Sequence, residues 1–433
     1  MDSIMEKIEQ KRVQVGIMGL GYVGLPLALE FTKIGFKVTG IDMDKKKIEA
    51  IYKGKSYIKD STDAEIKNAV EAGLLKATTD FSVLKELDTV SICVPTPLRK
   101  TKDPDISYII SATEQIRRYL HRGQLIVLES TTYPGTTEEI IQPELEATGL
   151  KAGVDFFLAF SPERIDPGNP FFNTKNTPKI IGGVTDKCTE VACALYKVAV
   201  DSIVPVSSTR AAEMVKLLEN TFRAVNIGLV NEIAIICNKL GMDVWEIIDA
   251  AATKPFGFMP FYPGPGLGGH CIPIDPHYLS WKLKMLNYNA RFIELASEVN
   301  TNMPYYVVNK VFDALNTQRK SINGSHILVL GVAYKKDIGD VRESPSLDVI
   351  KLLKGKGGMI SYHDPYIPDL HEENMDMNSI DFNDYNMLHN YDCTVIVTNH
   401  TFYDYNKIVE HSNIVVDTRN ATKGIVSPKI VKL

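Results

Sequence analysis

Cysteine is scarce in this sequence, and its placement excludes two kinds of stabilising framework. The 433 residues include six cysteines, at Cys93, Cys188, Cys193, Cys237, Cys271 and Cys393. No two of them form a CxxC pair, which argues against a zinc site and against a disulfide scaffold. The pattern is typical of reduced thiols in the cytoplasm, and we expect no bound metal.

Long apolar runs and a strong excess of positive charge are missing as well. No apolar segment reaches the about 20 residues that cross a bilayer, and residues 1–12 mix acids and bases, unlike a secretory signal. The net charge of −5 argues against a nucleic-acid or anionic-membrane partner, although it allows a local basic pocket for a small anion. Hydrophobic residues make up 44% and charged residues 23%, which predicts a soluble cytoplasmic protein of about two to four domains.

The first motif is a glycine-rich turn between an expected strand and an expected helix. Residues 13–18 form a short β-branched run, and Gly19-Leu20-Gly21-Tyr22-Val23-Gly24 follows at once. A second expected strand, residues 36–41, ends at Asp42, which stands 18 residues after the last glycine. A GxGxxG sequence alone is weak evidence, but this strand–turn–helix context is typical of a dinucleotide-binding fold.

The glycines and the acid have separate roles in such a fold. Gly19 permits a tight turn, Gly21 lets a pyrophosphate approach the backbone, and Gly24 allows the helix to pack closely on the strand. Asp42 would accept hydrogen bonds from the adenosine ribose and repel a 2′-phosphate, so we expect NAD as the cofactor and not NADP. Residues 45–47 are all lysines and lie near enough to weaken that preference.

Polar residues follow several later strands in the same half of the chain. These expected strands cover residues 89–94, 125–128 and 157–160. Thr96, Thr131 and Glu163 come directly after them. Ligand-binding groups gather at the carboxyl ends of strands in a doubly wound sheet, so we expect all three residues at one site.

Residues 209–240 form one long helical pattern without proline. Lys216 and Asn220 are four residues apart and therefore project from one face of this helix. Lys216 stands among apolar neighbours, where desolvation would make its ammonium a strong electrostatic group. A lysine whose head reaches solvent fits the pattern equally well. A long helix between two α/β units commonly packs against its twin, so we expect a homodimer or higher homo-oligomer through this helix.

A loop at residues 263–276, with sequence PGPGLGGHCIPIDP, carries a single thiol. Four glycines and four prolines exclude regular helix or strand, and such a loop loses much conformational entropy on ordering. Asp275 and Pro276 suit the N-cap and first position of a following helix. Cys271 would then lie before a helix N-terminus, where the dipole favours a thiolate. The alternative is a buried structural cysteine in a turn.

A second strand–loop–helix unit begins at residues 326–330. Its loop holds Lys335, Lys336 and Arg342, a cationic corner suited to a diphosphate, although a solvated charged loop is an equal alternative. We therefore predict an α/β protein with a Rossmann-type NAD domain, a central long-helix domain and a smaller Rossmann-like domain. The predicted bounds are 1–206, 207–320 and 321–433.

A dinucleotide fold combined with an activated thiol suggests oxidation through a covalent intermediate. A thiol adds to an aldehyde, loss of hydride gives a thioester, and water releases an acid. Lys216 and Asn220 are candidate oxyanion donors, while Glu163 and Asp275 are candidate bases. Three alternatives are a β-hydroxyacid dehydrogenase, a thiol hydrolase using Cys271 with His270, and a non-catalytic protein that binds NAD or a nucleotide sugar.

Seven motifs, in order, resemble the UDP-glucose/GDP-mannose dehydrogenase family along essentially the whole chain. They are GLGYVGLPLA at 19–28, CVPTP at 93–97, ESTTYPGT at 129–136, SPER at 161–164, EMVKLLENTFRAVNIGLVNE at 213–232, PGPGLGGHCIPIDP at 263–276 and GVAYKKDIGDVRESP at 331–345. The resemblance implies oxidation of a sugar C6 alcohol to a carboxylate by two hydride transfers to two NAD⁺.

The resemblance also implies roles for individual residues. Cys271 matches the nucleophile, Lys216 and Asn220 the oxyanion site, and Asp275 the carboxylate that orients water. Thr131 and Glu163 match the water-positioning hydroxyl and the acid/base. The cofactor-binding positions are Gly19, Gly21, Tyr22, Val23, Gly24, Asp42, Thr96, Thr131 and Arg342. The substrate-binding positions are Glu163, Arg164, Lys216, Asn220, Lys254, Tyr262, Gly268, Arg291 and Lys335.

Residues 253–276 and 289–294 are similar to the branch of the family that acts on UDP-N-acetylhexosamines. Within that branch the resemblance favours oxidation of UDP-N-acetylglucosamine for surface polysaccharides such as O-antigen and capsule. UDP-N-acetylmannosamine, which differs in stereochemistry at C2, and UDP-glucose remain alternatives.

Overall fold

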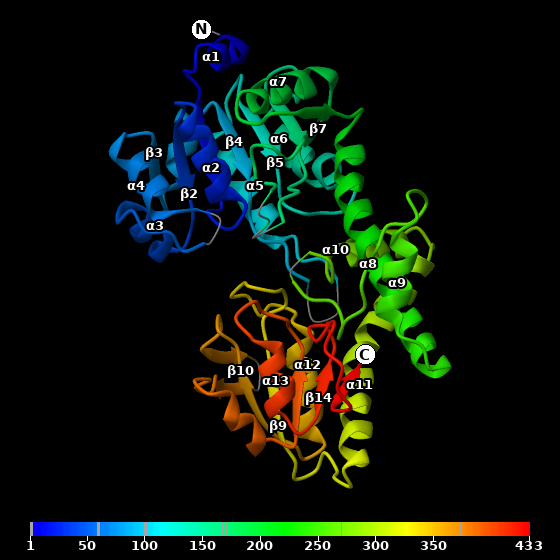
Figure 1. Cartoon of the computed structure of the whole chain (residues 1–433). Helices are drawn as coiled ribbons and strands as arrows, with labels where there is room; N and C mark the ends of the chain where they lie inside the picture. Colours follow the sequence, from blue (N-terminus) through cyan, green and yellow to red (C-terminus); the bar gives the residue numbers. More distant parts are fainter. Residues whose placement is uncertain are drawn as a thin grey trace. The chain divides into compact units, whose positions relative to one another are not determined.

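The computed structural model describes residues 3–58, 61–98, 103–166, 169, 171–269, 271–372 and 375–433. His270, the base of the thiol-hydrolase alternative, lies outside these residues. Packing divides the chain into two compact units (Figure 1). Unit 1 contains Met1–Glu219 and His277–Leu286, and unit 2 contains Asn220–Pro276 and Asn287–Leu433. The predicted three-domain bounds stay a prediction.

Unit 1 is built on an eight-stranded sheet with the order β3-β2-β1-β4-β5-β6-β7-β8. The strands are β1 (Gln14–Met18), β2 (Lys37–Ile41), β3 (Leu75–Thr78), β4 (Thr89–Ile92), β5 (Leu125–Leu128), β6 (Phe157–Phe160), β7 (Lys179–Gly183) and β8 (Ile203–Pro205). Neighbouring strands are parallel except for β6 and β7, which are antiparallel. The switch at β1, where the chain crosses from β3 to β4, brings the carboxyl ends of both halves together.

Helices cover both faces of this sheet because alternate strand residues point to opposite sides. Leu125 and Val127 of β5 pack in the core beneath α1 (Ile4–Glu9), α2 (Gly24–Lys33) and α7 (Asp186–Lys197). Ile126 and Leu128 pack in the core with η1 (Phe81–Glu86), α5 (Ser107–Tyr119) and α6 (Gln142–Glu146). The two short helices α3 (Lys45–Tyr52) and α4 (Asp63–Glu71) complete the β2–β3 crossover. In the other half, η2 (Thr137–Ile141) directly precedes α6. The predicted Rossmann-type fold is confirmed.

The helix α8 (Thr209–Leu240) is continuous over 32 residues and contributes to both units. In unit 2 it packs with α9 (Val244–Ala252) and α11 (Arg291–Thr317). Close approach to α11 depends on Gly228, where an added Cβ would lie 3.1 Å from the Cα of Ala296. Nearby, the buried Asn231 amide donates to Asn300 and its carbonyl oxygen accepts from Gly264 N–H.

The helix α10 (Asp275–Lys284) belongs largely to unit 1 although its neighbours in sequence belong to unit 2. The Tyr278 hydroxyl donates to the Thr96 carbonyl at 2.8 Å. Lys282 forms an ion pair with Glu139 at 2.7 Å, and the Trp281 ring packs on Tyr133. These contacts attach a late segment of the chain to loops that follow β4 and β5.

The C-terminal part of unit 2 holds a five-stranded parallel sheet with the order β10-β9-β13-β14-β15. Its strands are β9 (His326–Leu330), β10 (Met359–His363), β13 (Cys393–Ile396), β14 (Val415–Asp417) and β15 (Ile430–Lys432). The helices α11 and α12 (Pro345–Gly355) share one core with this sheet, and η3 (Tyr385–Asn390) and α13 (Tyr405–His411) share the other. A hairpin of β11 (Asp369–Glu372) and β12 (Met375–Asn378) is attached.

None of the helices within the described residues combines the length and apolar character needed to cross a membrane.

Candidate active site

The glycine-rich turn after β1 has the geometry that a dinucleotide requires. Gly19 has a φ of +93°, and an added Cβ would lie 2.5 Å from the Cys93 carbonyl oxygen. A Cβ at Gly24 would lie 1.9 Å from the Gly19 oxygen, so this glycine is needed for the turn to meet α2. At Gly21, by contrast, a Cβ would meet no described atom within 4 Å. Packing therefore does not require Gly21, which fits its predicted role of admitting a pyrophosphate.

Asp42 lies at the end of β2 beside this turn. Its Oδ2 accepts hydrogen bonds from Leu20 N–H and Lys47 Nζ, both at 2.8 Å, and its Oδ1 accepts from Asp44 N–H at 2.9 Å. Burial raises the pKa of Asp42, but Lys47 and the two backbone amides outweigh it and lower the pKa overall. The charged Oδ1 still has capacity for a ribose hydroxyl. Lys47, one of the three lysines predicted to weaken the preference for NAD, therefore forms an ion pair with Asp42 itself.

The three polar residues predicted at strand ends lie at one edge of the sheet. Ile92, Leu128 and Phe160, the last residues of β4, β5 and β6, are in direct register. Thr96, Thr131 and Glu163 follow these ends by three or four residues, and each is half-buried. Because β4, β5 and β6 are parallel and their last residues are in register, the residues that follow these strands lie at the same edge of the sheet.

Glu163 is held on several sides. Its Oε1 accepts from Arg164 N–H and Ile165 N–H, both at 2.9 Å, and its backbone oxygen accepts from Lys216 Nζ at 2.5 Å. Lys216 is 8% exposed, so the residue is largely buried and its ammonium is held by this hydrogen bond. Arg164 makes an ion pair with Glu219 at 2.6 Å and donates to the Pro178 oxygen. Lys216 and Glu163, which the sequence analysis named as candidate catalytic residues, are therefore in direct contact.

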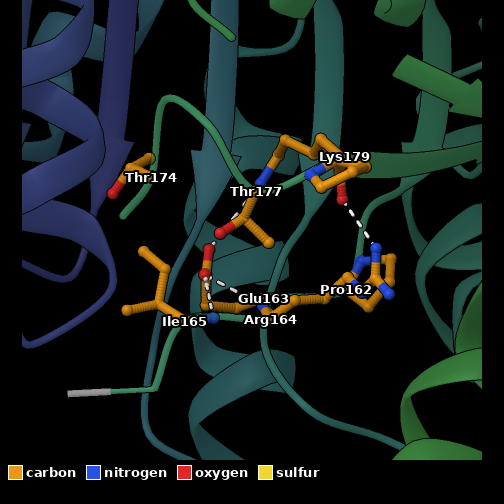
Figure 2. A pocket seen from close by; sticks show the side chains of 8 residues that line it. Pro162, Glu163, Arg164, Ile165, Thr174, Thr177 and Lys179 are labelled. Atoms are coloured by element: carbon orange, nitrogen blue, oxygen red, sulfur yellow. Dashed lines mark hydrogen bonds and ion pairs between the residues drawn. The ribbon is translucent and has the colours of Figure 1, made fainter. Parts of the chain in front are cut away.

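Figure 2 shows a small pocket beside Glu163, formed by the loop after β6 and the segment that enters β7. Its lining residues are Pro162, Glu163, Arg164, Ile165, Thr174, Thr177, Pro178 and Lys179. Lys179 lies 3.7 Å from Glu163 Oε2, so a cation stands within reach of the candidate acid/base.

Lys179 also anchors a buried polar network that sequence reasoning missed. Lys179 and Glu129 are 6% and 1% exposed, and their ion pair measures 2.7 Å. The Tyr196 hydroxyl donates to Glu129 and lies 2.9 Å from Ser91 Oγ. Burial opposes the charge on Lys179, but Glu129 and Glu163 outweigh it and raise the pKa of Lys179. The sequence did contain one signal for this network. Glu129 directly follows a buried strand, and a buried carboxylate requires a hydrogen-bonding or charged partner.

In unit 2 the Cys271 backbone leads directly into α10. Its carbonyl accepts from Ile274 N–H at 3.0 Å and from Asp275 N–H at 2.8 Å, so the thiol-bearing residue precedes the first helical turn. Asp275 was predicted as the N-cap, whereas α10 begins at Asp275 itself. The Asp275 side chain is 2% exposed, and the Asn220 amide donates to its Oδ2 at 2.5 Å. Three predicted catalytic residues, Cys271, Asp275 and Asn220, are therefore neighbours.

The glycines of this loop have a packing role within the protein. A Cβ at Gly268 would lie 2.6 Å from the Tyr334 Cβ, and one at Gly269 would lie 2.8 Å from the Tyr334 ring. Gly269 N–H also donates to the Arg342 oxygen at 3.0 Å. The cysteine-bearing loop is thus packed against the loop that carries the predicted diphosphate-binding lysine. A sequence cannot supply this reason, because it depends on a neighbour about 65 residues away.

The remaining predicted substrate residues are spread over unit 2. Lys254 and Arg291 are exposed, and Lys254 Nζ lies 5.0 Å from the centre of the Phe256 ring. Tyr262 donates to Asp249 at 3.0 Å, and Lys335 is half-buried.

Two predicted cofactor residues need a separate account. Arg342 donates through Nε and Nη2 to the Asp340 carboxylate, the shortest of these distances being 2.6 Å. Arg342 belongs to unit 2, whereas the glycine turn belongs to unit 1, so its contact with NAD stays a prediction. Tyr22 is 41% exposed at the glycine turn, and Val23 stands as the N-cap of α2.

Comparison with known proteins agrees with this arrangement. Sequence models of the UDP-glucose/GDP-mannose dehydrogenase family match the NAD binding domain at residues 13–200, the central domain at 210–302 and the UDP binding domain at 328–424. The chain is 35% identical over 418 residues to UDP-N-acetyl-D-mannosamine dehydrogenase of Pyrococcus horikoshii, covering 95% of this chain and 96% of that one. It is 36% identical over 390 residues to UDP-N-acetyl-D-glucosamine 6-dehydrogenase of Salmonella typhi, covering 90% of each.

A solved structure supports the same assignment. The structure of UDP-D-ManNAc dehydrogenase from Pyrococcus horikoshii matches with a TM-score of 0.88 and 34% identity, covering 97% of this chain and 98% of that one. The expectation that NAD is the cofactor is confirmed by the matched NAD binding domain. The chain belongs to the UDP-glucose/GDP-mannose dehydrogenase family and is an NAD-dependent oxidoreductase of nucleotide sugars.

Proposed function

We propose that the protein oxidises the C6 alcohol of a UDP-N-acetylhexosamine to a carboxylate, with UDP-N-acetylglucosamine as the first choice of substrate. UDP-N-acetylmannosamine is the second candidate, because relatives named for each sugar are about equally similar, at 35% and 36% identity. The product would be UDP-N-acetylglucosaminuronic acid, a building block for surface polysaccharide.

The proposed reaction consumes one alcohol, one water and two NAD⁺. NAD⁺, when bound, accepts one hydride from C6 in each oxidation, and each oxidation releases one proton. Between them the Cys271 sulfur adds to the C6 aldehyde and forms a thiohemiacetal, whose oxidation gives a thioester. Water then attacks the thioester carbon, the C–S bond breaks, and the carboxylate and the thiol are released.

Each candidate catalytic side chain is assigned a separate role according to its position. Lys216 and Asn220, one helical turn apart on α8, would donate to the oxygen at C6 when it carries negative charge. Asp275, held by Asn220, would orient water, and Glu163, half-buried between Lys179 and two backbone amides, would take its proton. Thr131 at the next strand end would position the same water.

The observation that carries this proposal is the placement of Cys271. It is half-buried and stands four residues before α10 begins at Asp275, whose buried carboxylate accepts from the Asn220 amide. A helix N-terminus would favour the thiolate form of this nearby cysteine over the thiol. A cysteine kept for packing would require neither the buried carboxylate nor the amide.

The mechanism is tested with Cys271→Ala and Cys271→Ser. We expect both variants to bind NAD⁺ as the wild type does and to form no uronic acid, because no thioester can form. Cys193→Ala, at another half-buried cysteine, is the matched control and should keep full turnover. Mass spectrometry of acid-quenched wild type should show a UDP-sugar adduct on the peptide containing Cys271. Unchanged acid production by Cys271→Ala would overturn the mechanism.

The substrate is tested by NADH release with UDP-glucose, UDP-GlcNAc, UDP-GalNAc and UDP-ManNAc at equal concentrations. The proposal expects the largest kcat/KM with UDP-GlcNAc and two NADH per sugar. A preference for UDP-glucose would overturn the N-acetyl assignment, and one NADH per sugar would favour a β-hydroxyacid-type dehydrogenase. No NADH with any sugar would favour a non-catalytic nucleotide-sugar-binding protein.

We also propose a homodimer or higher homo-oligomer formed through α8. The helix exposes Met214, Leu218, Phe222, Leu229 and Ile236, which are 36% to 58% exposed. Their spacing of four or seven residues gives one apolar stripe, which a second copy of the helix would cover. Because Cys271 must stay reduced to act, we place the enzyme in the cytoplasm.

A further inference from the structure

A buried histidine and aspartate hold the loop that follows β9. This loop, residues 331–337, carries Lys335 and Lys336. His400 and Asp364 come from two other segments, after β13 and β10, and their side chains are both fully buried. His400 Nε2 lies 3.0 Å from Asp364 Oδ2. Buried ionisable groups of this kind require an explanation, and neither residue has a role in the proposed mechanism.

Asp364 fixes the start of the loop. Its Oδ2 accepts hydrogen bonds from Val332 N–H at 2.8 Å and Ala333 N–H at 2.9 Å, and its Oδ1 accepts from Tyr366 N–H at 2.8 Å. Burial raises the pKa of Asp364, but His400 and the backbone donors outweigh it and lower the pKa. The carboxylate is therefore charged and holds two successive amides of the loop in one orientation.

His400 fixes the end of the same loop. Asp337 N–H donates to His400 Nδ1 at 2.9 Å, so Nδ1 is an acceptor and the ring proton sits on Nε2, where it donates to Asp364. Asp337 has a φ of +60°, a conformation uncommon for a residue other than glycine. Thr401 N–H donates to the Asp337 carboxylate at 2.8 Å. The two ends of the loop are thus joined through one imidazole.

We propose that His400 and Asp364 are positioning residues that preorganise this loop so that Lys335 can hold the diphosphate of the nucleotide sugar. The inference rests on the proposed role of Lys335 in that function. Both residues lie within residues 328–424, which match the UDP binding domain of the family. A loop held before binding loses less conformational entropy when the ligand arrives, which increases affinity without a direct contact.

The test uses isothermal titration of UDP into the full-length protein. His400→Ala should weaken UDP binding at least fivefold and raise the KM for UDP-sugar by a similar factor. It should leave kcat at saturating sugar within about twofold and leave NAD⁺ binding unchanged, because the glycine turn lies in the other unit. His400→Asn can retain the acceptor for Asp337 and His400→Gln can retain the donor to Asp364, so at least one of them should recover UDP affinity.

A matched control separates positioning from loss of stability. Thr394→Val removes the buried hydrogen bond of 3.0 Å between Thr394 and Ser412, near the amino end of β13 and away from the loop. It should lower the melting temperature and leave UDP affinity intact. If His400→Ala lowers the melting temperature while UDP affinity stays as in the wild type, the positioning role is wrong.

Lys335→Ala separates the inference from the proposed function. Weaker UDP binding in Lys335→Ala with unchanged binding in His400→Ala would refute the positioning role alone. Unchanged UDP binding in Lys335→Ala would refute the proposed role of Lys335, and with it the reason for positioning. If His400→Ala does not fold, His400→Phe decides, because its ring fills the space without the acceptor for Asp337 or the donor to Asp364. Wild-type UDP affinity in His400→Phe would overturn the proposal.

Discussion

Replacing Lys179 by methionine should destabilise unit 1 strongly. Methionine fills the space of the aliphatic stem but leaves the fully buried Glu129 carboxylate without the ammonium 2.7 Å away. Removal of one partner of a buried ion pair typically costs about 3–5 kcal/mol, because the desolvated charge remains. The Tyr196 hydroxyl continues to donate to Glu129, so we expect a loss at the lower end, about 3 kcal/mol.

The assay follows urea unfolding by circular dichroism and hydrogen exchange of peptides from β5 and β6. Exchange locates the loss in one unit, which matters because a chain of two units does not unfold in a single step. Lys187→Met is the control: its ion pair with Glu190 is about half exposed, so its loss should cost at most about 1 kcal/mol.

The double variant Glu129→Gln with Lys179→Met tests the same reasoning from the other side. Removal of both charges should restore part of the stability lost in Lys179→Met, because no buried charge then lacks a partner. Equal stability of Lys179→Met and wild type at pH 8 would refute the argument. So would a double variant whose loss equals the sum of the two single losses.

Three further predictions concern other parts of the structure. Burial raises the pKa of Glu213 to about 7 although Thr137 and Gly135 donate to it, so the folded state keeps a proton that the unfolded state loses above about pH 4.5. Relative to Glu213→Gln, the wild type should therefore lose about 3 kcal/mol of stability as the pH rises from 4.5 to 8, and parallel stability curves for the two proteins would contradict this. Asp42→Ala should weaken NAD⁺ binding about tenfold. It should also reduce the preference of the protein for NAD⁺ over NADP⁺, because Lys47 is released from its 2.8 Å ion pair. Dye-displacement titration with both cofactors measures the ratio of the two dissociation constants, and an unchanged ratio would exclude Asp42 from the ribose site. Leu229→Glu should convert the protein to monomers, as measured by light scattering coupled to size exclusion. Val154→Glu, at a 76% exposed apolar residue of unit 1, is the control and should leave the mass unchanged. An unchanged mass for Leu229→Glu would show that α8 does not form the interface.

Local patterns predicted the elements that carry strong periodicity or punctuation. The bounds 125–128, 157–160 and 209–240 agree with β5, β6 and α8. In the C-terminal part, Ser344 caps α12 and Pro345 opens it, an order of residues that is typical of helix starts. Such signals depend on neighbours a few residues away, which a sequence displays directly.

Other features depended on contacts that no local pattern contains. The strand β7 begins with Lys179 and ends in two glycines, which are poor strand residues, so its place in the sheet went unpredicted. Glu129 and Lys179 are 50 residues apart, and their partnership arises from the pairing of β5, β6 and β7. Four site residues, by contrast, could be predicted from local patterns. Helical spacing indicated Lys216 and Asn220, and the composition of the loop indicated Cys271 and Asp275.

The attachment of α10 to unit 1 has a consequence for how the polypeptide is made. Unit 1 needs residues 277–286, so a fragment that stops near residue 206 would lack the Tyr278, Trp281 and Lys282 contacts with loops after β4 and β5. During synthesis, these loops gain their final partners only after residue 286 has left the ribosome. The Cys271 loop is then already made, and it is covalently joined to the helix whose contacts complete unit 1.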